Sequence, residues 1–348
     1  MNQRRLVTWL VLGSVSLAVL ANAQPGNKKL AQTGMKFLNV GMGARQAGMA
    51  DAFTAAEGNA LSMFYNTAGM ARLTSFAEVA LGHVQWIADI KHFYGAVALS
   101  PFDGDYGVVG FTVQTVDYGE VEATIRANNA QGYLDVGTFK PNAYAFGIGY
   151  ARALSDKFSV GGNVKFVYQN LGSGIVGVTY SQGSDGQDSL YTPTREIKST
   201  LDVPAFDFGM LYRTGLESLT LGVSIRNFAR EVSYIQESFQ LPLIFKIGVS
   251  MNVLDVFAMD PASHSLMLAV DAEHPRDYPE QIKVGAEYVF SQTLSLRFGY
   301  VSPADEHGVS FGVGLQQSLV GTHLKVDYAY TPFGIFSSVQ RLSLNFSL

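Results

Sequence analysis

The chain has 348 residues, of which 47% are hydrophobic, 12% are aromatic and only 15% are charged. A soluble domain usually carries about 25% charged residues, and a disordered chain is much poorer in apolar residues. The net charge of −5 offers no basic surface for nucleic acid, and the lack of cysteine excludes disulfides, thiolate metal sites and thiol catalysis.

The first 23 residues have the pattern of a secretory signal peptide. Arg4 and Arg5 precede a short apolar stretch at 6–20, and Ala21-Asn22-Ala23 forms an A-x-A cleavage site. The alternative is an N-terminal membrane anchor, but the apolar stretch is short and the cleavage site is well formed. We therefore expect residues 1–23 to be removed on export, so that the mature chain begins at Gln24.

The stretch 40–74 is rich in Ala, Gly and Met and shows no alternation of apolar and polar residues. We expect a short helix near 59–63, turns around Asn66 and Gly69, and a compact shape for the whole stretch. Residues 24–75 are therefore expected to form an N-terminal extension that ends in this compact segment.

From residue 76 onward the dominant signal is a period of two. In 341–348, for example, four apolar residues alternate with Arg, Ser, Asn and Ser, which is typical of a strand with one apolar and one polar face. About fourteen such strands are predicted, at 76–87, 91–100, 105–117, 141–153, 157–170, 203–214, 217–229, 240–253, 263–275, 279–290, 293–302, 308–317, 321–331 and 338–348.

The length of these strands indicates a membrane barrel. Most have ~10–13 residues, longer than the usual five or six of globular strands and long enough to cross a bilayer at a tilt. The long gaps at 118–140, 171–202 and 230–239 all follow odd-numbered strands, as expected if both termini are periplasmic and the long loops face outward. A soluble β-sandwich is disfavoured because the polar faces are mostly Gly, Ser and Asn.

We therefore predict an all-β transmembrane antiparallel β-barrel of about 14 strands at 76–348, embedded in outer-membrane lipid. A barrel of this width needs something in its lumen, so 40–74 is expected to form a plug there. In 341–348 the apolar face should meet lipid, so Leu344→Arg should hinder assembly far more than Ser343→Arg.

The polar strand faces carry charges of both signs, which we expect in the lumen. Glu287 with Arg297 and Asp327 with Arg341 are predicted ion pairs that fill the interior; the alternative is a polar path through the wall. The predicted lumen charges are Lys165, Asp207, Arg213, Arg226, Lys246, Asp271, Glu273, Lys283, Glu287, Arg297, Lys325, Asp327 and Arg341.

In two predicted strands the apolar residues change from odd-numbered to even-numbered positions partway along the strand. The change falls between 109–113 and 116–118 in the third strand, and between 79–81 and 84–86 in the first. Each change predicts a β-bulge or kink. A kinked strand could open the barrel wall, or it could merely end the strand pairing early.

The segment 44–71, ARQAGMADAFTAAEGNALSMFYNTAGMA, resembles the N-terminal plug of FadL-like outer-membrane barrels. The places that match this plug motif are Ala44, Arg45, Gly48, Met49, Phe53, Tyr65, Asn66, Ala68 and Gly69, while Thr67 stands where the family usually has proline. The C-terminal half, at 271–290, 294–300, 326–334 and 340–348, resembles the PorV/PorQ branch of these barrels. The resemblance implies the outer membrane of a Gram-negative bacterium.

Two functions are implied. As a PorV/PorQ-type component of the type IX secretion system, the chain would bind exported proteins or a secretion-system attachment partner through its outer loops. The alternative is a FadL-like channel for hydrophobic small molecules. Apolar residues suited to partner binding in the long loops are Tyr133, Leu134, Phe139, Ile175, Val176, Tyr180 and Tyr191, which would otherwise only pack the loops over the barrel mouth.

The sequence gives no sign of an enzyme. A G-x-S-x-G match at 308–312 falls in a predicted strand, whereas a nucleophile elbow needs a strand, a sharp turn and a helix. No H-E-x-x-H pattern is present among the six histidines. We therefore assign no catalytic, metal-binding or cofactor-binding residues and expect no cofactor.

Overall fold

The computed structural model describes residues 33–348 except positions 258, 261, 306 and 320. The predicted signal peptide at 1–23 and the first part of the extension, 24–32, lie outside the described residues.

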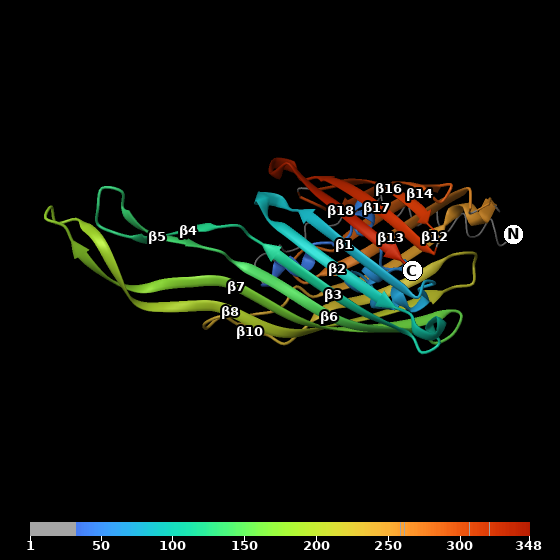
Figure 1. Cartoon of the computed structure of the whole chain (residues 1–348), viewed down its shortest axis with the longest axis horizontal. Coiled ribbons are helices and arrows are strands. Elements are labelled where there is room, and N and C mark those ends of the chain that lie inside the picture. The colour runs from blue at the N-terminus through green and yellow to red at the C-terminus, as the bar shows by residue number, and fades with distance from the viewer. Residues whose placement is uncertain (1–32, 258, 261, 306, 320) are drawn as a thin grey trace.

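Fourteen antiparallel strands form a closed barrel (Figure 1), in which β18 returns to pair with β1 and Leu344 lies opposite Leu81. The barrel strands are β1 (Ala77–Gln85), β2 (Lys91–Leu99), β3 (Val108–Asp117), β6 (Asn142–Ala153), β7 (Phe158–Gln182), β8 (Asp188–Arg213), β9 (Thr220–Phe228), β12 (Ile244–Asn252), β13 (His264–Pro275), β14 (Gln281–Phe290), β15 (Leu294–Ser302), β16 (Val309–Leu319), β17 (Thr322–Pro332) and β18 (Ser338–Ser347). The prediction of fourteen strands is confirmed.

The two faces of the strands follow the predicted alternation. In β18 the side chains of Leu342 and Leu344 are 47% and 36% exposed on the outside, whereas Ser343 between them is fully buried. An apolar outer surface of this extent suits lipid rather than water. Ser343 is not a roomy lumen position, however, because its hydroxyl lies 2.6 Å from the Tyr94 hydroxyl and accepts a hydrogen bond from Ala44 N. The structure therefore gives no reason to expect that Ser343→Arg would be mild.

Two of the predicted outward loops are strands instead. The region 171–202 forms the outer halves of β7 and β8, which have 25 and 26 residues, and 118–140 contains the hairpin of β4 (Val121–Arg126) and β5 (Tyr133–Phe139). These strands project well beyond the barrel as an arm (Figure 1). Water covers both faces of such a ribbon, so it lacks the alternation that marked the barrel strands. In 230–239 a small hairpin pairs β10 (Val232–Ser233) with β11 (Ser238–Phe239).

The bulges predicted in the first and third strands are absent. Both β1 and β3 pair with their neighbours without a register shift. The apolar positions change along these strands because Val84 and Val116 point inward, where they are buried in hydrophobic clusters with the N-terminal segment. A register shift occurs instead between β8 and β9, where Asn227 has a φ of 59°.

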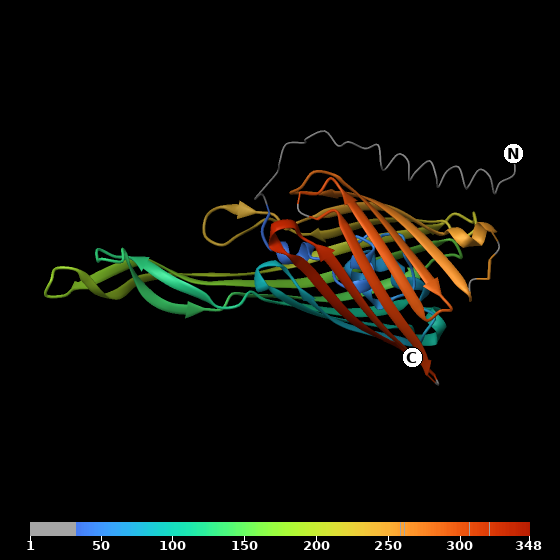
Figure 2. The same ribbon diagram turned by 90° about the horizontal axis from the view of Figure 1, so that it is seen from above.

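Residues 33–73, called the lumenal segment below, lie inside the barrel, as the blue ribbon in Figures 1 and 2 shows. The described helices are all short: η1 (Lys36–Asn39), α2 (Ala44–Gly48), η2 (Ala60–Phe64) and η3 (Thr67–Arg72) in this segment, and η4 (Ile87–Asp89), η5 (Pro101–Gly104), η6 (Val253–Phe257) and η7 (Gly334–Phe336) between strands. None of the described helices is long and apolar enough to cross a membrane. The helix expected near 59–63 corresponds to η2.

Candidate functional site

The lumenal segment is seated on inward-facing glycines of the barrel wall. A Cβ atom at Gly161 would lie 2.6 Å from Ala68 N, and one at Gly299 would lie 2.2 Å from Ala50 N. Both distances are too short for any side chain, and the opposing atoms belong to the backbone, so no rotamer change can relieve them. Gly222 and Gly285 approach the segment backbone equally closely, at Thr54 O and Met49 O, and Gly312 lies against Gly48. At Gly110, Gly149 and Gly209 a Cβ would first meet side chains of the segment. The wall therefore holds the backbone of the segment at van der Waals distance.

A buried carboxylate fixes the middle of the segment. Asp271 on β13 is fully buried, and its Oδ2 accepts hydrogen bonds from Phe53 N (3.0 Å), Thr54 N (3.0 Å) and Thr54 Oγ1 (2.6 Å). Hydrogen bonds to a charged acceptor are stronger than those between neutral groups. Asp271 is thus the polar anchor of this part of the segment.

Residues of the plug motif named in the sequence analysis hold the segment together. Tyr65 donates to Asp51 Oδ1 (2.6 Å) and lies 2.8 Å from Met42 O, while its ring packs edge-on against Phe53 at 5.7 Å. Asn66 caps η3, since its Oδ1 accepts from Ala68 N at 3.2 Å. The side chain of Asn66 also donates to the wall at Met210 O (3.1 Å).

Gly69 is required by close approach rather than by an unusual turn. A Cβ there would lie 2.8 Å from Ala56 O, and its φ is not in the left-handed region. Gly48 of the segment similarly lies directly against Gly312 of the wall, and Met49 packs against Gly285. Ala44 donates its N–H to Ser343 Oγ at 2.6 Å.

A chain of ion pairs runs from the segment to β14 and onward to β15 and β17. Arg45 makes a two-pronged contact with Glu287, and Arg297 binds Glu287 through Nε at 2.7 Å, as expected for this pair. Arg297 also reaches Asp327 at 2.9 Å. The predicted pair of Asp327 with Arg341 is wrong, because Asp327 lies opposite Ser343 in the register and Arg341 donates to Gly41 O instead.

The remaining lumen charges are also mostly paired. Lys246 and Lys283 each lie 2.6 Å from Glu273, and Lys165 lies 2.8 Å from Asp207. Arg213 stands at the rim of the barrel, where it pairs with Glu57 of the segment. Three of the predicted lumen cations have no carboxylate within ion-pair distance among the described residues: Arg226, Lys325 and Arg341, the last of which donates to Gly41 O and Thr331 Oγ1 instead.

Asp51, a segment residue that sequence reasoning missed, sits among these charges. Burial acts to raise the pKa of Asp51, but the nearby Arg341, Lys283 and Lys246 outweigh it and lower that pKa. The carboxylate therefore stays ionised and can hold Tyr65. No sequence pattern marked Asp51, because its partners come from distant strands.

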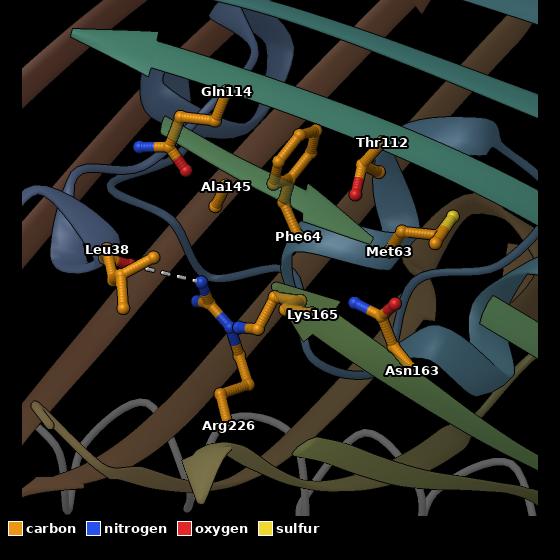
Figure 3. Close-up of a pocket in the computed structure, with 9 residues that line it drawn as sticks. All are labelled: Leu38, Met63, Phe64, Thr112, Gln114, Ala145, Asn163, Lys165 and Arg226. Carbon is orange, nitrogen blue, oxygen red and sulfur yellow. Dashed lines mark hydrogen bonds between the residues drawn. The ribbon is translucent and has the colours of Figure 1, made fainter. Parts of the chain in front are cut away.

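A cleft and a small cavity adjoin the described part of the segment. A cleft with a cavity volume of about 590 Å³ opens at the end of the barrel where β1 begins and β18 ends, and Arg45, Glu78 and Lys325 are among its lining residues. A second, very small cavity of about 10 Å³ lies between the segment and β3, β6, β7 and β9 (Figure 3).

Aromatic side chains gather at the opposite end, where β1 ends and the β17–β18 loop lies. The ring of Phe333 packs edge-on against Trp86 at 5.3 Å and stacks on His307 at 4.6 Å. Trp86 also contacts His92, and Arg341 lies over the Trp86 ring at 5.6 Å. Phe333 and Trp86 also pack with Val40 and Met42 of the segment in one hydrophobic cluster.

The predicted partner-binding residues lie on the arm. Tyr133, Leu134 and Phe139 belong to β5, Ile175 and Tyr180 to β7, and Tyr191 to β8; the side chain of Val176 is outside the described part. Tyr133 is well exposed, whereas Tyr180 donates its hydroxyl proton to Arg126 O and Phe139 packs against Gly172. The last two contacts hold the arm together.

Asp188 joins the two hairpins of the arm, which the sequence did not reveal. Its carboxylate accepts from Asn128 N at 2.8 Å, and its own N–H donates to Asn128 O at 3.0 Å. The arm is therefore one connected unit rather than two separate loops.

Comparison with solved structures places this architecture among outer-membrane barrels. The toluene transporter TbuX of Ralstonia pickettii superposes with a TM-score of 0.55 at 13% identity, over 88% of this chain and 97% of its own. The toluene transporter TodX of Pseudomonas putida gives 0.55 at 12% identity over 88% and 97%, and a FadL homologue of Pseudomonas aeruginosa gives 0.53 at 13% over the same shares. The chain therefore has the fold of a FadL-like barrel. No family model matches it, and no curated protein matches it by sequence.

Proposed function

We propose that this protein is an outer-membrane channel for hydrophobic small molecules in a Gram-negative bacterium. The observation that carries the proposal is the agreement in fold, over 88% of the chain, with structures described as toluene transporters. The apolar outer belt supports the membrane location.

The lumen offers an apolar layer that can rearrange. Five methionines of the segment, Met35, Met42, Met49, Met63 and Met70, are buried against the wall or within the segment. Methionine is unbranched and polarisable, so it repacks around guests more readily than branched side chains do. A hydrophobic molecule would enter beside the aromatic cluster at Trp86 and leave through the cleft near Lys325.

Because the segment fills the lumen, passage requires it to shift, as a plug would. Ala47 of the segment and Ala329 of β17 pack in one buried cluster, and the chain has no native cysteine. A double variant, Ala47→Cys with Ala329→Cys, would tie the segment to the wall once a gel shift confirms the disulfide.

The test measures uptake of labelled toluene and of a labelled long-chain fatty acid by cells that produce the protein. We expect the parent chain to speed uptake, the oxidised double variant to block it, and a reductant to restore it. Uptake no faster than in cells without the protein would reject the channel. Normal uptake by the oxidised variant would retain the channel but reject movement of the segment.

The arm favours a second candidate function, binding of exported proteins as a PorV/PorQ-type secretion component. The arm stands outside the barrel, and Leu190 near its tip is 68% exposed. A channel for small molecules gains nothing evident from such a projection, whereas an extended rigid ribbon suits contact with another protein.

Shortening the arm separates the two candidates. Residues 175 and 196 lie opposite each other, so replacing 175–196 by a two-residue turn removes matched lengths of both strands. We expect the barrel to fold and uptake to persist. If the arm binds exported proteins, their attachment at the cell surface is lost; unchanged attachment rejects this second function.

A further inference from the structure

The small cavity beside Arg226 has room for about one water molecule, so a chloride ion, which is slightly larger, enters when the flexible Met63 side chain at the cavity wall moves aside a little. The cavity volume of about 10 Å³ is close to the minimum that holds one water molecule. Segment residues Leu38, Met63 and Phe64 close one side, and strand residues including Lys165 and Arg226 form the other (Figure 3). An organic ligand or sulfate cannot enter so small a space.

The charge at this cavity is not balanced. Lys165 is paired with Asp207 at 2.8 Å, and Asp207 is further engaged by Asn163 Nδ2 (3.0 Å) and Asn227 N (2.8 Å). Arg226 is only 8% exposed and has no carboxylate within ion-pair distance in the described part of the chain. Two cations and one carboxylate leave one positive charge uncompensated.

The guanidinium of Arg226 is also short of hydrogen-bond partners. Its Nε has none, and its Nη2 makes one long contact, 3.5 Å, to Leu38 O. The face of Tyr65 lies 5.8 Å away, which gives only weak compensation. A buried charge without a partner is strongly unfavourable, so a native structure normally supplies one.

We propose that this cavity binds one small monovalent anion, chloride, against Arg226 and Lys165. The anion neutralises the surplus charge and takes the free Nε–H of Arg226. Because Arg226 also contacts Leu38 O, and Met63 and Phe64 cover the cavity, the anion bridges the wall and the lumenal segment. It therefore helps to hold the segment in the barrel, whatever the barrel transports.

The experiment compares the purified full chain in chloride and in gluconate of equal ionic strength, since gluconate is too large for the cavity. We expect a higher thermal unfolding midpoint in chloride, because a ligand that binds only the folded state stabilises it. Arg226→Met should lose this shift, and Arg226→Lys, which keeps the charge, should retain part of it. Arg213→Met, at the exposed rim, is the control and should respond like the parent.

Crystals grown in bromide give an independent measurement. We expect an anomalous scattering peak beside Arg226 in the parent chain and none in Arg226→Met. Equal unfolding midpoints in chloride and gluconate, or a chloride response that survives in Arg226→Met, would overturn the proposal. A cavity with no bromide peak in the parent chain would likewise count against the proposal.

Discussion

Adding one methyl group at Gly161 should dislodge the lumenal segment, whereas adding it at the next residue should not. A Cβ at Gly161 would lie 2.6 Å from Ala68 N, so reaching an ordinary contact of 3.4 Å requires a shift of 0.8 Å (3.4 minus 2.6) of segment or wall backbone. Gly162 faces the other way, and its nearest neighbour would be Asp207 O at an unstrained 3.7 Å. Gly162→Ala is therefore the matched control for Gly161→Ala.

The expected effect of Gly161→Ala on the stability of the seated segment follows from the cost of overpacking, about 1–3 kcal/mol. If displacement of the segment relieves this strain, its open population rises about 5- to 150-fold. The chain has no cysteine, so Ser62→Cys, at a buried segment position, can report opening through its rate of reaction with a water-soluble maleimide. Equal labelling rates in the Gly161→Ala and Gly162→Ala backgrounds would refute the seating of the segment on wall glycines.

Two other substitutions test the faces of the strands and the anchor of the segment. Leu344→Arg should lower barrel stability by about 2–4 kcal/mol if the position lies near the bilayer midplane. Asn345 lines the open cleft beside Asp327, so Asn345→Arg should assemble normally in a gel-shift folding assay. Equal assembly of the two variants would contradict the assigned faces. Asp271→Ala leaves the N–H groups of Phe53 and Thr54 without their acceptor, at a cost of about 1–3 kcal/mol of stability each. It should therefore speed maleimide labelling of the cysteine at position 62. Glu122→Ala on the exposed arm is the control and should leave that rate unchanged.

The barrel was predictable because lipid and lumen impose opposite demands on successive residues. That contrast produces the period of two along the wall strands, which is broken only locally in β1 and β3, where Val84 and Val116 pack on the segment. As an example, β14 at Gln281–Phe290 was predicted at 279–290. The outer halves of β7 and β8 escaped prediction because water lies on both of their faces. Their Thr and Val residues favour strands, but the hydrophobic alternation is absent there.

Register was the weaker part of the prediction. The register between two neighbouring strands decides which charged residues lie opposite each other. Alternation predicts which face of a strand each residue occupies, but it does not predict that register. Glu287 and Arg297 were expected to pair and do, since they are directly opposite. Arg341 lies opposite Ala329 rather than Asp327, so its partner is the segment backbone at Gly41 O.

The inward faces of the wall strands combine two kinds of residue, and the lumenal segment explains both. Where the backbone of the segment touches the wall, the wall has glycine, as at Gly161 and Gly299, because no side chain fits. Where the segment stands off, the wall has long charged side chains that reach it, as Glu287 does for Arg45. A glycine contact keeps the segment close but binds it weakly, whereas each ion pair or carboxylate anchor holds it at one point. The segment is thus attached by a few ion pairs and hydrogen bonds, with glycine contacts between them. Loss of one such attachment, as in Asp271→Ala, should release the segment locally and leave the barrel closed.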